Sequence, residues 1–214
     1  MKLFKKIEFK PLLISVGMII LQTILYFLAK ALQGEAHIIG GFIDYKIPFC
    51  NLFIIPYCIW YLLVFMIPYY LYIKDKDALS TYVSAYLICS IIADIIFVIY
   101  PTMVIRPDVK NIGFFNFITK FIYWTDTPPI NCMPSLHCAI SMLFILTTFS
   151  SKYVSKIFKI FIFIISFLIM LSTLFIKQHV FIDFLTGITI MIYVYIFVIH
   201  NKSLINKTKK LLHL

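Results

Sequence analysis

Six apolar runs separated by polar stretches constrain what this chain can fold into. Five of them are long enough to cross a hydrocarbon core of about 30 Å as helices, and they cover residues 12–29, 52–73, 78–100, 157–176 and 180–199. The sixth, 135–149, would be only about 22 Å long as a helix, so we interpret it as a span that begins below the membrane surface. We therefore predict an all-α polytopic membrane protein, a six-transmembrane helical bundle that forms a single domain over residues 1–214.

Composition and charge support this prediction and give the bundle an orientation. A chain that is 62% hydrophobic and 13% charged cannot cover a water-soluble surface. Its net charge of +10 comes from lysines at the ends of the runs, where anionic lipid head groups explain them better than nucleic acid does. With six spans both termini share one side, and because basic residues are retained in the cytoplasm, we predict cytoplasmic termini and outward-facing opposite loops in the plasma membrane. The terminal side holds 13 of the 19 basic residues: Lys2, Lys5, Lys6, Lys10, Lys74, Lys76, Lys152, Lys156, Lys159, Lys202, Lys207, Lys209 and Lys210.

The longest connection, about 101–134, lies on the outward side and contains an amphipathic pattern. Phe114, Phe117, Ile118, Phe121 and Ile122 follow the spacing of one face of a helix. This pattern is typical of a helix that lies flat at a membrane interface, so we predict an interfacial helix in the third loop. It could admit a lipid to a site beside it, or it could be a packing cover.

Two polar motifs stand out against this apolar background. Pro134-Ser135-Leu136-His137 opens the short sixth run and supplies free backbone N–H groups, a hydroxyl and an imidazole, which together suit a phosphate group. Lys177-Gln178-His179 is followed by Asp183, four residues after the histidine. On a helix the two would share a face, and the carboxylate could fix the imidazole tautomer and make its other nitrogen a nucleophile.

The motifs resemble those of a known family. Pro134-Ser135-Leu136-His137 and His179 with Asp183 resemble the second and third signature motifs of the type 2 phosphatidic acid phosphatase superfamily (lipid phosphatase and haloperoxidase-like proteins), and Arg106 with Pro107 resembles the end of the first. Leu136 in place of glycine, together with the Lys-Gln-His run, is similar to the inositol phosphorylceramide synthase-like branch. The resemblance covers about residues 100–187. Two cations of the phosphatase pattern are replaced, by Ile99 and Thr173, and Lys177 is the nearest substitute.

The resemblance implies a metal-independent lipid phosphatase without a cofactor. Its substrate would be a lipid phosphate monoester or pyrophosphate, such as phosphatidate, phosphatidylglycerophosphate or a polyprenyl (pyro)phosphate, bound at the extracytoplasmic face. His179 would form a phosphohistidine while Asp183 orients it, and His137 would transfer protons. The implied site residues are catalytic His179, His137 and Asp183, and phosphate-binding Arg106, Ser135 and Lys177.

Two other functions remain open at this stage. The first is a lipid head-group phosphotransferase of the inositol phosphorylceramide synthase type, in which an alcohol replaces water as the acceptor. The second is a non-enzymatic membrane protein, such as a lipid transporter, that keeps the fold without the chemistry. The complete set of His137, His179 and Asp183 stands against this last function.

The remaining polar residues give weaker signals. The five cysteines show no metal-ligand spacing, and only Cys50 and Cys132 could both face outward and pair, which the sequence leaves open. Asp94 is an acid deep in a predicted span. It could pair with Arg106 or Lys177, or it could make a hydrogen bond between helices without a catalytic role.

Overall fold

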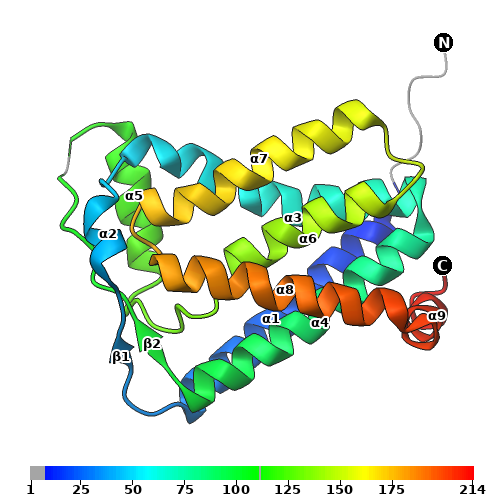
Figure 1. Cartoon of the computed structure of the whole chain (residues 1–214), viewed down its shortest axis with the longest axis horizontal. Coiled ribbons are helices and arrows are strands. Elements are labelled where there is room, and N and C mark those ends of the chain that lie inside the picture. Colours follow the sequence, from blue (N-terminus) through cyan, green and yellow to red (C-terminus); the bar gives the residue numbers. More distant parts are fainter. Residues whose placement is uncertain (1–7, 111) are drawn as a thin grey trace.

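The computed structural model describes residues 8–110 and 112–214. The elements of this part of the chain, shown in Figure 1, are α1 (Phe9–Leu32), β1 (His37–Ile38), α2 (Phe42–Lys46), a 3₁₀ turn (Asn51–Phe53), α3 (Ile54–Lys74), α4 (Lys76–Ile99), β2 (Thr102–Met103), α5 (Phe114–Thr125), α6 (Leu136–Ser150), α7 (Lys156–Phe175), α8 (Phe181–His200) and α9 (Lys202–Leu211).

Five helices are long and apolar enough to cross a membrane, in agreement with an all-α membrane protein. They are α1, α3 with its preceding 3₁₀ turn, α4, α7 and α8, and each lies at one of the five long runs of the sequence. The shorter apolar helix α6 runs alongside them through the bundle and packs against α4, α7 and α8 (Figure 1).

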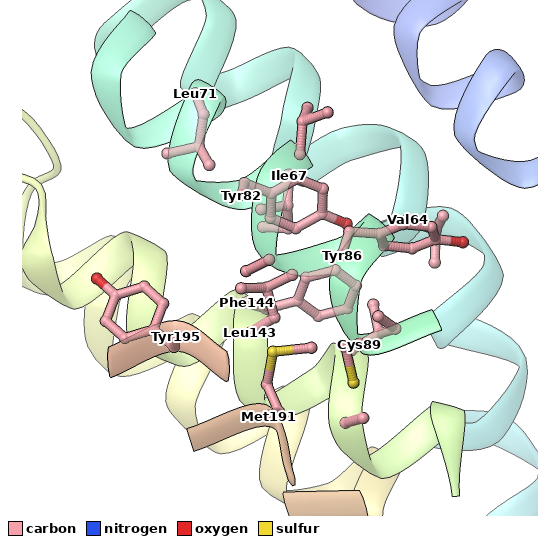
Figure 2. Close-up of a cluster of buried hydrophobic side chains, with 14 of the residues drawn as sticks. Val64, Ile67, Leu71, Tyr82, Tyr86, Cys89, Leu143, Phe144, Met191 and Tyr195 are labelled. Atoms are coloured by element: carbon pink, nitrogen blue, oxygen red, sulfur yellow. The ribbon is translucent and has the colours of Figure 1, made fainter. Parts of the chain in front are cut away.

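The core of the bundle lies around α6. Figure 2 shows Leu143 and Phe144 of α6 between side chains of α3, α4 and α8. The Phe144 ring is fully buried and stacks on Tyr82 of α4, with ring centroids 6.3 Å apart. The outer faces of α1 and α7 instead expose large apolar side chains, including Phe27 and Phe163. Such faces suit lipid rather than water.

Polar residues fix where several of these helices begin. The carboxylate of Asp75 accepts hydrogen bonds from the backbone N–H groups of Asp77 and Ala78 at the start of α4. Ser135, Ser155 and Asn201 cap α6, α7 and α9 in the same way. Because these caps satisfy N–H groups that a helix leaves without partners, they set the ends of the apolar helices.

The two ends of the bundle differ. The C-terminus and α9 lie at one end, whereas α2, α5 and the two strands lie at the other (Figure 1). Of the basic residues predicted to share the terminal side, Lys2, Lys5 and Lys6 lie outside the described residues. The residues of the two motifs all belong to the end opposite α9, because α6 and α8 both begin there.

The end of the bundle opposite α9 contains two short strands that the sequence did not predict. Strand β1 pairs with β2 in parallel, so that His37 lies opposite Thr102, and this joins the segment after α1 to the segment after α4. A helix, α5, occupies the long loop, and its apolar residues form one broad face that the bundle covers only in part. Phe115, Ile118 and Ile122 pack on the bundle, whereas the exposed residues are Phe114, Phe117, Phe121 and Trp124.

Candidate active site

His179 and Asp183 form a hydrogen-bonded pair at the turn between α7 and α8. The Nδ1 atom of His179 lies 3.2 Å from Oδ2 of Asp183, whose side chain is fully buried. The same carboxylate oxygen accepts the backbone N–H of Val180 at 3.1 Å. His179 precedes α8, so the pair forms across the helix cap instead of along one helix face as the spacing had suggested. Because an ionised carboxylate only accepts hydrogen bonds, Nδ1 carries the proton and Nε2 is left with a free lone pair.

The turn before α8 fixes the backbone of this histidine. Lys177 adopts a left-handed conformation with φ of 55°. The backbone N–H groups of Gln178 and His179 then both donate to the carbonyl oxygen of Thr173 at 3.0 Å. These bonds give the carbonyl oxygen of Thr173, near the end of α7, its hydrogen-bond partners, and they turn the chain toward the start of α8.

The beginning of α6 is joined directly to this pair. The backbone N–H of Ser135 donates to the carbonyl oxygen of Asp183 at 3.2 Å. Its side chain is fully buried, and Oγ accepts the backbone N–H of Cys138 at 3.4 Å as the cap of α6. The sequence predicted a phosphate-binding role for this hydroxyl, whereas its contact in the structure is to its own helix.

Gly187 allows this close approach of α8 to the start of α6. A Cβ atom added at Gly187 would lie 2.3 Å from the carbonyl oxygen of Ser135, which is a backbone atom that cannot rotate away. The two motifs can therefore meet only if a residue without a side chain occupies this position.

We expect Gly187→Ala to separate the motifs and to lower activity sharply. Overpacking of this kind costs about 1–3 kcal/mol, and a displacement of about 1 Å near a reacting group lowers turnover by about 100-fold. The measurement is turnover per folded protein together with the thermal midpoint. Gly17→Ala in α1 is the matched control, because nothing lies within 4 Å of its Cβ position. Wild-type turnover in Gly187→Ala would contradict the close packing.

His137 lies in the first turn of α6 among aromatic rings of α3. Its ring stacks on Tyr57 with centroids 4.7 Å apart, and it lies 4.4 Å from Trp60. The His137 and His179 rings are 5.9 Å apart between centroids. The Nε2 atom of His137 is buried and has no hydrogen-bond partner among the described residues. It is therefore available to exchange a proton with a bound molecule.

Arg106 is held by the segment at the end of α5. Its Nη1 donates to the carbonyl oxygen of Asp126 at 2.9 Å, and its Nη2 pairs with the carboxylate of the same residue. The guanidinium also lies over the ring of Tyr123, 4.8 Å from the centroid. These contacts leave the side chain only 8% exposed, so a phosphate could bind it fully only by replacing Asp126.

Lys177 is bound to the end of α2. Its Nζ donates to the backbone carbonyl oxygens of Asp44, at 2.8 Å, and of Ile47. Partial burial lowers the pKa of Lys177, while the nearby Asp44 carboxylate acts in the opposite direction. The ammonium group has three N–H donors, so one remains for a further acceptor.

Two cavities share His179 and divide the other site residues. The first, about 450 Å³, is lined by both histidines and by residues from α1, α3, α4 and the loop before α6. The second, about 560 Å³, is lined by Arg106, Lys177 and His179. The structure therefore brings five of the six predicted residues to or beside these cavities, with Asp183 behind His179. Ser135 lines neither of them.

The other polar residues singled out in the sequence are Asp94, Cys50 and Cys132, and within the described residues none of them makes a hydrogen bond to His179 or Asp183. Asp94 accepts a hydrogen bond at 3.3 Å from Gln22 of α1, so of the two interpretations the contact between helices is the one observed. Its predicted partners, Arg106 and Lys177, are bound elsewhere. Cys50 and Cys132 are both free thiols. Within the described residues there is no group of three or more His, Cys, Asp or Glu side chains that could hold a metal ion.

Several lining residues were missed by the sequence interpretation. Tyr57, Trp60 and Tyr61 of α3 surround His137. Their i, i+3, i+4 spacing places them on one helix face, but this face does not stand out in a helix that is apolar on all sides. Gln178, which lies inside the second motif, lines the first cavity together with Gln22.

Comparison with known proteins supplies the family. Neither the search of curated proteins nor the search of solved structures returned a match. A scan against protein-family models, in contrast, matches residues 37–197 to the PAP2 superfamily. This match covers most of the chain and includes His137, His179, Asp183 in the first turn of α8, and the cations of the second cavity. The chain therefore belongs to the PAP2 superfamily, the type 2 phosphatidic acid phosphatase superfamily that its motifs resemble.

Proposed function

We propose that this protein is a membrane lipid phosphatase that hydrolyses a lipid phosphate monoester or pyrophosphate through a phosphohistidine at His179. The observation that supports it best is the pair of neighbouring imidazoles, whose ring centroids are 5.9 Å apart and which line one cavity; of the two, His179 is the one bound to a carboxylate. Two histidines in such different surroundings suit two different roles. Membership of the PAP2 superfamily supports a phosphatase or phosphotransferase activity in general.

His179 is the nucleophile in this proposal. Its Nε2 attacks phosphorus and the bond to the lipid alcohol breaks. The Asp183 carboxylate, 3.2 Å from Nδ1, stabilises the positive charge that develops on the ring. His137 protonates the departing alcohol, then removes a proton from the water that releases phosphate in the second step.

The phosphate lies in this proposal on the side of the second cavity, where Arg106 and Lys177 supply positive charge. Arg106 exchanges its contact with Asp126 for the phosphoryl oxygens, and Lys177 adds its remaining donor. The free N–H groups at the start of α6 add further donors, and Ser135 contributes by holding them in place. None of these steps uses a metal ion, so turnover is expected to continue in the presence of a chelator.

A second candidate is a head-group phosphotransferase, including the inositol phosphorylceramide synthase type. The same phosphohistidine can be resolved by an alcohol instead of water. The observation in its favour is the first cavity, whose volume of about 450 Å³ far exceeds what a single attacking water requires.

Product analysis tests both candidates. Purified protein would receive phosphatidate, phosphatidylglycerophosphate and a polyprenyl diphosphate, each labelled at phosphorus, with and without an added alcohol. We expect labelled inorganic phosphate from at least one lipid without an alcohol, unchanged by a chelator. A phosphorylated alcohol as the main product would favour the transferase. Absence of any product from every lipid would contradict enzymatic activity and favour the non-enzymatic alternative.

We also propose six spans, with α6 as the sixth, cytoplasmic termini and a site that faces outward across the plasma membrane. The exposed aromatic face of α5 supports an interfacial position for that helix, because Phe and Trp side chains bind at the level of lipid head groups.

Cysteine labelling tests this orientation. We expect a cysteine at the exposed position Asp108 to react with a membrane-impermeant maleimide added outside intact cells, because this loop adjoins the site. A cysteine at Lys152, in the connection between α6 and α7, should react only after the membrane is permeabilised. Replacing Cys50 and Cys58 with serine removes the two cysteines that are not buried. The opposite labelling pattern would reverse the proposed topology.

A further inference from the structure

The first cavity contains an unusual concentration of uncharged polar atoms without partners. Gln178 is 3% exposed and Asn131 is 6% exposed, and within the described residues neither carboxamide makes a side-chain hydrogen bond with its nitrogen or its oxygen. Oε1 of Gln22 and Nε1 of Trp60 are also buried and without a partner. All four side chains line the cavity that holds His137 and His179. Buried polar groups in native proteins normally have partners, so these atoms point to a bound molecule.

We propose that these carboxamides form a subsite for a neutral polyhydroxylated group that takes part in phosphoryl transfer at His179, either as a free acceptor that supplies a hydroxyl or as the head group carried by the lipid donor. The inference rests on the proposed phosphohistidine chemistry and specifies its phosphotransferase form, because it assigns a polyol as well as water to the first cavity.

The position of the subsite follows from three separate segments of the chain. Gln22 comes from the middle of α1, Asn131 from the loop before α6, and Gln178 from the turn that also positions His179. Because His179 directly follows Gln178, a molecule bound to that carboxamide lies beside the nucleophile. The cavity of about 450 Å³ falls within the range of small-molecule sites, roughly 300–1,000 Å³.

The chemistry of the lining selects for hydroxyl groups. No lysine or arginine lines this cavity among the described residues, which disfavours an anion there. The single carboxylate, Asp126, is already paired with Arg106, which removes the attraction for a cation. Each carboxamide offers two N–H donors and a carbonyl acceptor, and each hydroxyl offers one donor and two lone pairs. Neighbouring hydroxyls can therefore satisfy the donor and the acceptor of one carboxamide together.

The aromatic residues complete the subsite. Tyr26 of α1 and Phe97 of α4 line the same cavity and pack edge to face, with ring centroids 6.2 Å apart. Such rings offer apolar surface to the C–H groups of a polyol while the carboxamides bind its hydroxyls. A polyol thus matches both the aromatic rings and the carboxamides that line the cavity. A simple apolar alcohol would leave the carboxamides without hydrogen-bond partners.

The transfer step balances without another reactant. A polyol hydroxyl attacks phosphorus, its proton passes to Nε2 of His137, and the bond between phosphorus and Nε2 of His179 breaks. If the donor is a phosphate monoester, the product is a polyol phosphate. If instead the polyol is already esterified to the donor's phosphate, the same subsite holds it while the lipid alcohol departs. The subsite chemistry is the same in both cases.

Product partition tests the free-acceptor case. Wild-type protein would receive phosphatidate labelled at phosphorus with glycerol, xylitol, myo-inositol or, as the apolar comparison, 1-hexanol. We expect the ratio of phosphorylated alcohol to inorganic phosphate to be at least about ten-fold higher for the best polyol than for hexanol, as loss of two or three hydrogen bonds implies. Gln178→Met removes an amide at similar volume and should lower that ratio about ten-fold. Gln33→Met is the control, because Gln33 also has a buried oxygen without a partner but lines none of the cavities described here.

A lipid that carries the polyol itself tests the second case. Phosphatidylglycerol and phosphatidylinositol with the same acyl chains as phosphatidate would be compared as donors. If the polyol arrives on the donor, the KM for one of these diesters is lower than for phosphatidate, and Gln178→Met raises it about ten-fold. If the polyol arrives as a free molecule, Gln178→Met changes the ratio of phosphorylated alcohol to inorganic phosphate but not the KM for the diesters.

Binding of radiolabelled polyol gives a readout that does not depend on turnover. Wild-type and Gln33→Met protein should bind the labelled polyol saturably, and Gln178→Met should bind it at least about ten-fold more weakly. Release of phosphate without polyol binding, without a change in product ratio and without preference for a diester would overturn the subsite while leaving the phosphatase intact. Polyol binding without any turnover would overturn the proposed function and leave the subsite standing. Absence of both would overturn both.

Discussion

Replacing His179 with alanine is expected to abolish turnover, because the proposed mechanism forms its covalent intermediate on this imidazole. Among the histidines of the described residues, His179 is the one whose ring is bound to a carboxylate, with Nδ1 3.2 Å from Oδ2 of Asp183. Removing the nucleophile should lower kcat by on the order of 10⁴-fold or more for every lipid substrate. The measurements are steady-state turnover and acid-quench detection of labelled phosphoenzyme, which should be absent in the variant.

The control for this substitution is the histidine at the far end of α8, the helix that follows His179. His200→Ala removes an exposed imidazole whose Nδ1 lies 2.8 Å from the carbonyl oxygen of Ile196. It should keep wild-type turnover and phosphoenzyme. Asp183→Asn keeps the shape of the pair but can no longer balance the charge on the ring, so it should resemble His179→Ala more than wild type. A full yield of phosphoenzyme in His179→Ala would exclude this histidine as the nucleophile.

The sequence predicted the apolar helices well because their signal is local. A run of apolar residues long enough to cross a membrane can be read without knowing any contact, and α4 (Lys76–Ile99) begins and ends within two residues of the predicted span. Capping also acts locally: Ser135 was expected at a helix start and does cap α6. The association of the two motifs followed from the family resemblance, and their direct contact at Gly187 adds a physical reason for it.

The sequence could not predict the partners of the two cations. Arg106 pairs with Asp126, twenty residues later at the end of α5, and Lys177 binds carbonyl oxygens of α2, more than one hundred residues earlier. Neither contact has a fixed spacing, because both depend on how the loops fold back over the bundle. The sequence predicted that the Arg106 guanidinium is free to bind phosphate. In the structure it is paired with the carboxylate of Asp126, a residue outside the motif.

The aromatic surroundings of His137 were hidden for a different reason. In a soluble helix the buried face differs in polarity from the exposed face, whereas α3 is apolar on all sides because both protein and lipid favour apolar residues. Tyr57 and Trp60 therefore carried no periodic signal against their neighbours. Only the packing of α3 beside the start of α6 shows that they contact the imidazole.

Replacing His137 with alanine is expected to impair catalysis in a way that depends on the leaving group. Its Nε2 is buried, lies in the cavity of His179 and has no partner within the described residues, as suits a proton donor to a departing alcohol. A lipid alcohol leaves poorly without a proton, so turnover of the lipid phosphate should fall by about 10²–10⁴-fold. A nitrophenyl phosphate releases an anion that needs no proton, so formation of its phosphoenzyme should stay within about ten-fold of wild type.

The second half of the reaction then separates His137 from His179. With nitrophenyl phosphate, His137→Ala should release a burst of nitrophenolate and then stall. Without a base, water attacks the phosphohistidine slowly and labelled phosphate accumulates on His179. Rapid-quench kinetics with both substrates measures the burst and the stall. Trp60→Phe changes the packing beside His137 but keeps the imidazole, so it should show no stall. If the activated substrate instead restored His179→Ala and left His137→Ala inactive, the two imidazoles would have exchanged roles, and His137 would be the nucleophile despite having no carboxylate beside it.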